Sequence, residues 1–212
     1  MSQKEFWSDR YKNVGDQYLF GMEPNHYLKS HRDLIVSSGN SAMLVADGEG
    51  RNSIWLSEQG LKVTACDISP VAIEKAKKLS DSRDGKPNFI CGDMLAEEFS
   101  EIYLQETFDW VVGIFIQFTD AQERVKQFNL MKGLTRSGGR ILLQGYTKKQ
   151  LEYKTGGPSN LENLYTKEIL GFAFADWEIE ELREYEEVIS EGLGHQGMSA
   201  LIGMVARKPF GS

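Results

Sequence analysis

The sequence predicts an α/β fold: a parallel sheet of five strands with helices on both faces, followed by an antiparallel pair of strands. Two observations predict it. Apolar runs typical of strands alternate with helical patterns from residue 42 to about residue 145. After residue 146, two more strand-like runs are joined by one loop, which makes them antiparallel neighbours. At 212 residues, one domain is the simplest organisation, and it is long enough to bury a substantial core.

The first five strands and their helices follow one another in regular order. Strands are expected at 42–46, 62–66, 88–91, 110–114 and 140–144. Helices are expected at 52–58, 70–79, 96–104 and 121–134, and an earlier one at 27–37. Ser69 is a suitable N-cap for the helix at 70–79, in which Val71, Ile73, Ala76 and Leu79 form an apolar stripe.

The pattern changes after the fifth strand. A loop at 154–158 precedes a helix that begins at Thr166 and reaches residue 172. Strands are then expected at 177–188 and 199–207, with the loop 190–197 between them. The many glutamates between residues 178 and 191 are expected on a solvated strand face.

Composition excludes several classes of function. The net charge of −7, without any cluster of Lys or Arg, argues against nucleic acid or an anionic membrane as the partner. No apolar run approaches the roughly 20 residues of a membrane span, and the N-terminus has no apolar signal-peptide core. The two cysteines, Cys66 and Cys91, are expected to be buried thiols in a reducing compartment, so we expect a cytoplasmic protein. No Cys/His cluster has the spacing of a metal site.

A glycine-rich turn follows the first strand. In residues 44–53, Leu-Val-Ala-Asp-Gly-Glu-Gly-Arg-Asn-Ser, an apolar run ends in Ala46, Gly48 and Gly50 before a helix begins. Small residues let the backbone approach a ligand, and the free N–H groups of the helix favour a carboxylate or a phosphate. A purely structural strand-to-helix turn would contain the same glycines.

Two acidic residues end the next two strands. Asp67 is suited to accept both hydroxyls of a ribose, although a surface residue that caps the next helix would look the same. Asp93, followed by Met94, is suited to accept from the amino group of an adenine. Because open α/β sheets bind ligands at the carboxyl ends of their strands, the three features together predict a nucleoside-bearing cofactor. An NAD site fits less well, because its Gly-x-Gly-x-x-Gly fingerprint has Ser53 at the last position.

Nearly the whole chain resembles the class I S-adenosylmethionine-dependent methyltransferases, near the tellurite-resistance and thiopurine methyltransferase group. The matching segments are Trp7-Ser-Asp-Arg10-Tyr11, Tyr18-Leu-Phe20-Gly21-Met-Glu-Pro24-Asn25, Gly48-Glu-Gly50-Arg-Asn-Ser53, Val63-Thr-Ala-Cys-Asp67-Ile-Ser69, Gly92-Asp93-Met94, Phe108-Asp109, Gly138-Gly139 and Ala206-Arg-Lys-Pro209. The resemblance implies a Rossmann-like, seven-stranded sheet in a single domain, 1–212. Its parts would be an N-terminal lid (1–40), cofactor-binding βα units (41–146), and a substrate-side loop, helix and strand pair (147–212).

The same resemblance implies a role for each matching position. The methionine part of S-adenosylmethionine would be bordered by Ala46, Asp47, Gly48 and Gly50. The ribose would bind Asp67, with the adenine against Ile68 and held at its edge by Asp93 and Met94. The sulfonium would lie near Ile114 and Phe115. Lid or substrate contacts are expected from Arg10, Tyr11, Tyr18, Phe20 and Gln117.

Three positions depart from the family's pattern. The usual acidic residue of the first strand is Leu44, the first glycine of the turn is Ala46, and a position that is often histidine is Gln117. These departures concern how the cofactor's amino group is bound, for which Asp47 or Glu49 is a substitute acceptor.

Candidates for catalysis are few, because the chain has three histidines. His195 follows the expected strand at 177–188, in a region where tellurite-resistance relatives bind substrate through a His-Arg pair. Here no arginine follows before Arg207, so a polar loop histidine is the competing interpretation. Tyr153 follows the fifth strand on the substrate side, and loop packing is its alternative. His26 and His31 are expected on a helix surface.

We therefore expect methyl transfer from S-adenosylmethionine to a small-molecule acceptor, with a thiol or chalcogen compound favoured by the resemblance. Alignment and exclusion of water are the protein's main contribution to such a displacement, and a soft nucleophile needs no general base. The alternative is a cofactor-binding sensor or interaction protein without turnover. A monomer or a homodimer is expected, with no nucleic-acid or membrane partner.

Overall fold

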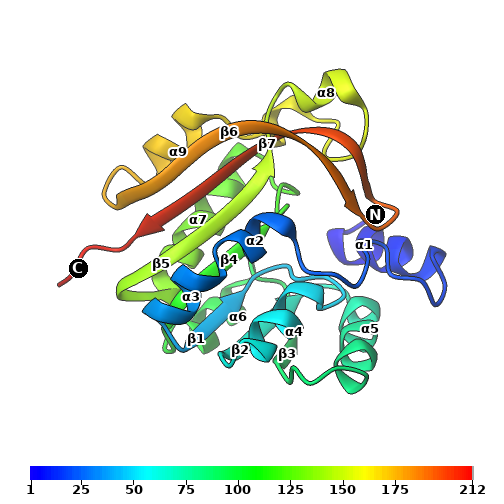
Figure 1. The fold of residues 1–212 in the computed structure, drawn as a ribbon, viewed down its shortest axis with the longest axis horizontal. Coiled ribbons are helices and arrows are strands. Elements are labelled where there is room, and N and C mark those ends of the chain that lie inside the picture. The colour runs from blue at the N-terminus through cyan, green and yellow to red at the C-terminus, as the bar shows by residue number, and fades with distance from the viewer. Residues whose placement is uncertain (212) are drawn as a thin grey trace.

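A computed structural model describes residues 1–211 of the chain. Its centre is one seven-stranded sheet in the order β3-β2-β1-β4-β5-β7-β6 (Figure 1). Strands β1 to β5 are parallel, and β7 is antiparallel to both β5 and β6. The predicted fold class is therefore confirmed. The strands are β1 (Ser41–Leu44), β2 (Lys62–Asp67), β3 (Asn88–Cys91), β4 (Phe108–Ile114), β5 (Thr135–Tyr146), β6 (Glu178–Glu191) and β7 (His195–Arg207).

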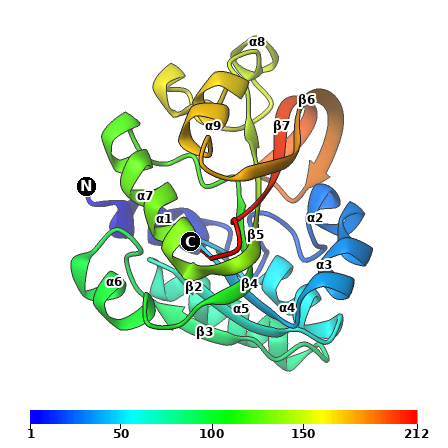
Figure 2. The same ribbon diagram turned by 90° about the vertical axis from the view of Figure 1, so that its left-hand side faces the viewer.

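Helices cover both faces of the sheet (Figure 2). On one face lie α2 (His26–Ser30), α3 (Arg32–Ser38) and α4 (Arg51–Glu58), and on the other α6 (Glu97–Tyr103), α7 (Ala121–Leu134) and α9 (Lys167–Ala173). Alternate side chains of each strand point to opposite faces, so Leu44 packs in the α4 layer and Met43 in the α7 layer. The remaining helices are α1 (Gln3–Asn13), α5 (Pro70–Asp81), α8 (Gln150–Tyr153) and the short 3₁₀ helix at Leu161–Asn163.

Local capping explains where α5 and α1 begin. At the start of α5, the Ser69 hydroxyl accepts from the Ala72 N–H, and Pro70 occupies the first turn. At the start of α1, Ser2 and Glu5 form a reciprocal capping box. This cap fixes the first residue of α1, a helix that is not among those expected from the sequence.

The hairpin of β6 and β7 is longer than the sequence predicts. The expected loop 190–197 shrinks to three residues, 192–194, and Glu191 pairs directly with His195 at the end of the ladder. The polar composition of this segment had suggested a loop, but the ladder of backbone hydrogen bonds continues through it. His195 is therefore the first residue of a strand and is buried, so the expectation of a loop position is wrong.

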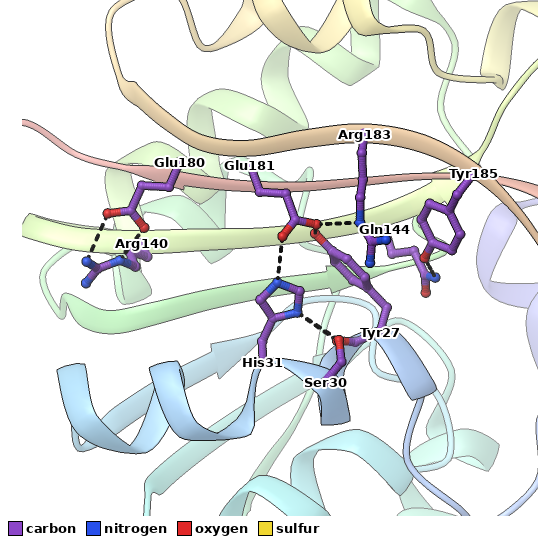
Figure 3. A network of polar contacts seen from close by, with 9 residues as sticks. All are labelled: Tyr27, Ser30, His31, Arg140, Gln144, Glu180, Glu181, Arg183 and Tyr185. Carbon is purple, nitrogen blue, oxygen red and sulfur yellow. Dashed lines mark hydrogen bonds and ion pairs between the residues drawn. The ribbon is translucent and has the colours of Figure 1, made fainter.

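Polar contacts also correct two expectations for the N-terminal region (Figure 3). The helix expected at 27–37 is divided at His31 into α2 and α3. His31 does not lie on a free surface: its Nε2 is 3.1 Å from a carboxylate oxygen of Glu181, which also accepts from the Tyr27 hydroxyl at 2.9 Å. Glutamates of β6 thus pair with neighbouring elements, as Glu180 does with Arg140, and are not simply a solvated face.

The two thiols lie in different surroundings. Cys66 is buried, and burial raises its pKa to about 12, whereas Cys91 is exposed at the end of the sheet's outer strand, contrary to expectation. Within residues 1–211, no group of three or more His, Cys, Asp and Glu residues could hold a metal ion. Over the same residues, no helix has the length and apolar character needed to cross a membrane.

Candidate functional site

A cavity of about 880 Å³ opens at the carboxyl ends of β1, β2 and β4. The turn after β1 and the ends of β2 and β4 form its floor and α1 lines it from the N-terminal side. Tyr146 at the end of β5 and His195 at the start of β7 close its far end. Distant parts of the chain meet here because the carboxyl ends of parallel strands share one edge of a sheet.

The glycine-rich turn has the backbone geometry that brings a ligand close. Gly48 (φ 65°) and Gly50 (φ 87°) are left-handed, and Ala46 adopts φ 50° although it has a side chain. A Cβ atom at Gly48 would lie 2.8 Å from the hydroxyl of Tyr11, so glycine lets the Tyr11 side chain approach the turn closely. A Cβ at Gly50 would instead lie 2.8 Å from the Cβ of Ala76 in α5, so Gly50 serves helix packing and does not line the cavity.

Asp67 is buried at the end of β2, where it lines the cavity. Its carboxylate accepts from the backbone N–H groups of Gly48 and Ser69, both at 2.9 Å. Burial raises the pKa of Asp67 to about 6, and the two N–H donors only partly oppose this. The predicted neighbours Ile68, Asp93 and Met94 line the same wall.

Asp47 is the least satisfied polar group of the cavity wall. Both carboxylate oxygens are shielded from solvent and lack a hydrogen-bond partner among the described residues. Ser53 lies nearby, but its hydroxyl donates to the Gly50 carbonyl oxygen. Burial raises the pKa of Asp47 to about 7, and Asp67 adds to the effect while Ser53 and Arg51 oppose it. A buried, unpaired carboxylate is costly to the free protein and suits a cationic ligand group.

Glu49, the other substitute acceptor, is already occupied. Its carboxylate pairs with Lys75 at 3.0 Å and accepts from the Leu19 N–H at 2.7 Å. The Lys75 ammonium also donates to the carbonyl oxygens of Tyr11 and Gln17. Of the two residues, only Asp47 therefore offers free oxygens at the turn.

The N-terminal segment closes over the turn, as a lid would. Arg10, Tyr11 and Phe20 line the cavity, and so does Trp7, which had not been singled out as a site residue. The Arg10 guanidinium stacks 5.0 Å above the Trp7 ring and forms no ion pair within residues 1–211. Tyr18 lies outside the cavity lining, with its hydroxyl on the carbonyl oxygen of Lys75.

His195 lies among aromatic rings at the far end of the cavity. The centroid of its ring is 4.4 Å from that of Phe115 and 4.5 Å from that of Phe20, and its Nδ1 is hydrogen-bonded to the Tyr146 hydroxyl. Burial and, next to it, the charge of Arg51 lower the pKa of His195 to about 3. This imidazole is therefore neutral at physiological pH. Tyr146 had not been chosen as a site residue; its place at the end of the fifth strand was the available signal.

Two other predicted residues lie differently from expectation. Tyr153 is outside the cavity lining, because its hydroxyl turns to Glu186 on β6. Gln117 lines the cavity, but its side-chain amide is hydrogen-bonded to the backbone. It donates to the carbonyl oxygens of Tyr146 and Asn163 and accepts from the Tyr146 N–H. The predicted residues Ile114 and Phe115 do line the cavity.

A buried junction joins the turn, the lid and the hairpin. Arg51, the first residue of α4, donates to Glu191 at 2.6 Å, and both side chains are more than 90% buried. The same carboxylate accepts from Asn25, which also donates to Gln144 at 2.7 Å. Burial alone raises the pKa of Glu191, but Arg51 and Asn25 hold it below its ordinary value. Because His195 pairs with Glu191 in the ladder, the junction links His195 to the helix that follows the glycine-rich turn.

Comparison with known proteins gives this cavity a context. Residues 43–139 match the family model described as a methyltransferase domain. This segment of the chain is therefore similar to methyltransferase domains. The match agrees with the family predicted from the sequence. The unpaired oxygens of Asp47 fit the cationic methionine end of S-adenosylmethionine, the cofactor predicted from the sequence.

One curated relative and two solved structures are similar to this domain. A thiopurine S-methyltransferase of Nitrosospira multiformis is 33% identical over 75 residues, a match that spans about a third of either protein (34% of this chain and 33% of the relative). A structure described for the conversion of a disulfide bond into a thioacetal group during echinomycin biosynthesis is 17% identical, with a TM-score of 0.80 over 100% of this chain and 93% of that one. Magnesium protoporphyrin IX methyltransferase of Synechocystis, with bound S-adenosylmethionine, gives 14% identity and a TM-score of 0.66 over 98% of each chain. At these identities the two structures establish the fold.

Replacing Asp47 by Asn should stabilise the ligand-free protein in a pH-dependent way. In the unfolded chain the carboxyl ionises near its ordinary pKa of 3.8, whereas in the folded chain it keeps its proton to about pH 7. Stability is therefore lost as pH rises between these values, and Asp47→Asn removes the loss. We expect the gain in free energy of unfolding at pH 8 to exceed that at pH 5 by about 1–3 kcal/mol in urea titrations. Equal gains at both pH values would show that the pKa of Asp47 is not raised in the folded protein.

Glu191→Ala should destabilise the protein strongly, because it leaves the Arg51 charge buried and unpaired. We expect the free energy of unfolding to fall by about 3–5 kcal/mol in a denaturant titration. Glu184→Ala, at an exposed position of the same strand, is the matched control and should change stability by no more than about 0.5 kcal/mol. Similar losses in the two variants would argue against the junction.

Proposed function

We propose that this chain transfers the methyl group of S-adenosylmethionine to a small-molecule acceptor, and that the acceptor is a thiol or chalcogen compound. The observation that carries the proposal is the single cavity that joins the glycine-rich turn to an aromatic chamber around His195. The first part suits a nucleoside with an amino-acid tail, and the second suits an acceptor placed in line with it.

In the cofactor part, Asp67 would accept the ribose hydroxyls, while Ile68, Asp93 and Met94 would hold the adenine. Ala46, Asp47 and Gly48 would border the methionine end, with Asp47 as the acceptor for its ammonium group. Gly50 would act indirectly, by packing α4 against α5. We propose that the whole chain works as one domain, in which the N-terminal segment is the lid.

In the acceptor part, aromatic side chains dominate the wall. Phe20, Phe115 and Tyr146 surround His195, and Phe6, Trp7 and Phe118 extend the same surface. A chamber with such walls favours a small, apolar or planar acceptor over a protein or nucleic acid. The names of the thiopurine methyltransferase and of the echinomycin structure, which both concern sulfur chemistry, agree with a sulfur acceptor. We propose no nucleic-acid or membrane partner, and a monomer or homodimer in the cytoplasm.

Methyl transfer from a sulfonium would require little acid–base catalysis by the protein. The bound cofactor supplies a methyl group on a positively charged sulfur, which is a very good leaving group. Phe115, Tyr146 and His195 would orient the acceptor, and α1 with Phe20 would exclude water. With a pKa near 3, His195 is a poor general base at neutral pH. A soft nucleophile that already carries its lone pair, such as a thiolate, fits this site better than an alcohol or an amide.

Asp67→Ala should weaken binding of S-adenosylhomocysteine by about 1–3 kcal/mol, because the ribose hydroxyls would lose their acceptor. Calorimetric titration of the wild type and the variant measures the difference. An unchanged affinity would refute the proposed role of Asp67.

Two measurements test the function itself. Calorimetry with S-adenosylmethionine and S-adenosylhomocysteine comes first, and the absence of binding would contradict the proposal. A methyl-transfer screen over aromatic and aliphatic thiols, selenite, tellurite, small amines and small acids comes second. We expect turnover with thiols or chalcogen compounds. Binding without any turnover would favour a sensor or interaction protein, for which the departures at Leu44 and Ala46 would then be the explanation.

A further inference from the structure

The two ring nitrogens of His195 have different surroundings. Nδ1 is hydrogen-bonded to the Tyr146 hydroxyl, whereas Nε2 has no hydrogen bond to any residue in 1–211. Nε2 is not sealed away either, because the buried unpaired side-chain atoms of the described chain belong to Asp47, Trp110, Asn163 and Tyr165. Since His195 lines the cavity, Nε2 is the nitrogen that an acceptor would meet.

The Tyr146 hydroxyl determines which nitrogen carries the hydrogen. It is buried, and its only hydrogen bond within the described residues is to His195 Nδ1. Burial raises the pKa of Tyr146, with Glu191 adding to the effect, so the hydroxyl keeps its hydrogen. If Nδ1 were the donor, the hydroxyl hydrogen would be buried without an acceptor, which is costly. Tyr146 therefore donates to Nδ1, and a neutral imidazole with an accepting Nδ1 carries its hydrogen on Nε2.

We propose that Tyr146 is a positioning residue that fixes His195 in its Nε2–H tautomer, and that this N–H binds a methyl acceptor that enters the cavity as an anion, such as a thiolate. The inference rests on the proposed function for the identity of the acceptor, but the tautomer itself does not depend on turnover. It gives His195 the role of a hydrogen-bond donor, in place of the general base that a histidine in such a position suggests.

The charges around His195 are compatible with an anionic acceptor. The charges of Arg51 on α4 and Arg10 on α1 lower the pKa of His195, and the charge of Glu191 on β6 raises it. Glu191 is committed to its ion pair with Arg51, whereas Arg10 has no ion pair within residues 1–211. The ring itself is uncharged at physiological pH, since its pKa is about 3. It offers a hydrogen bond without giving up a proton, and the unpaired cation beside it favours an anion.

The transfer step balances without proton movement. The acceptor has released its thiol proton to water before it binds, and its sulfur attacks the methyl carbon. A carbon–sulfur bond forms on the acceptor while the bond from the methyl carbon to the sulfonium breaks. The bonding electron pair stays on the sulfur of the cofactor, so thiolate and sulfonium charges cancel. His195 keeps its Nε2 hydrogen throughout.

Nitrogen NMR of the full-length chain, with ¹⁵N-labelled histidine, tests the tautomer directly. The chain has three histidines, so the His195 signals are those that disappear in His195→Gln. We expect a neutral ring from pH 5 to pH 8 with the hydrogen on Nε2. Tyr146→Phe should shift the population toward the Nδ1–H form. A wild-type ring with its hydrogen on Nδ1 would overturn the inference even if Tyr146→Phe did not fold, and so would a folded Tyr146→Phe that kept the wild-type tautomer.

Tyr165→Phe is the matched control. Tyr165 is a fully buried tyrosine whose hydroxyl has no hydrogen-bond partner among the described residues. Its replacement removes the same atom from a similar environment without touching His195. The NMR signals of His195 should stay those of the wild type, and a shift equal to that in Tyr146→Phe would show that the tautomer does not depend on Tyr146.

Methyl transfer to a probe thiol, thiophenol, tests the donor role. His195→Ala should lower kcat/KM by about 10–100-fold, whereas His195→Gln, which retains an N–H donor, should stay within about fivefold of the wild type. The wild-type rate should rise with pH as the probe thiol ionises. Equal losses in both variants would overturn the donor role. If S-adenosylhomocysteine binds but no acceptor is methylated, the proposed function fails while the tautomer result stands. If thiols are methylated but His195 carries its hydrogen on Nδ1, the proposed function stands and the present inference fails.

Discussion

The ion pair between Arg51 and Glu191 is the contact on which the arrangement of the site depends. It joins three parts of the chain that have no sequence proximity: the helix after the glycine-rich turn, the tip of the terminal hairpin and, through Asn25, the N-terminal segment. Both charges are removed from water, so their desolvation is repaid only while every donor stays in place. The cavity is therefore complete only when the lid, the turn and the hairpin are assembled together.

Neighbouring residues of the turn after β1 have different structural roles. Gly48 lets the Tyr11 side chain approach the turn closely, and Gly50 lets α4 approach α5. Glu49 holds the N-terminal segment through Lys75 and Leu19, and Arg51 holds it through Glu191. Asp47 alone keeps free oxygens. The glycine-rich turn therefore both borders the cavity and holds the N-terminal segment in place.

The sequence predicts the parallel strands, the glycine-rich turn and Asp67 because each depends on local order: apolar runs, small residues, and an acid at a strand end. The misplaced residues depend on distant partners. His31 and Glu191 have polar side chains that suggest a surface, and only the packing of α2 and α4 against β6 buries them. Tyr153 follows the fifth strand as expected, but an ion-paired glutamate on β6 draws it outside the cavity. Hairpin length was underestimated because ladder pairing has no local sequence signature.

The electrostatics of the two ends of the cavity are opposite, and this contrast connects the fold to methyl transfer. At the turn, Asp47 and Asp67 are buried acids that lack a cation partner of their own, so this end favours a positively charged ligand. At the far end, Arg10 forms no ion pair within residues 1–211 and the histidine stays neutral, so this end favours a negative one. A sulfonium and a thiolate have the charges that such a gradient would align. Because both ends are held in register by the same buried junction, loss of Glu191 would be expected to disturb alignment as well as stability.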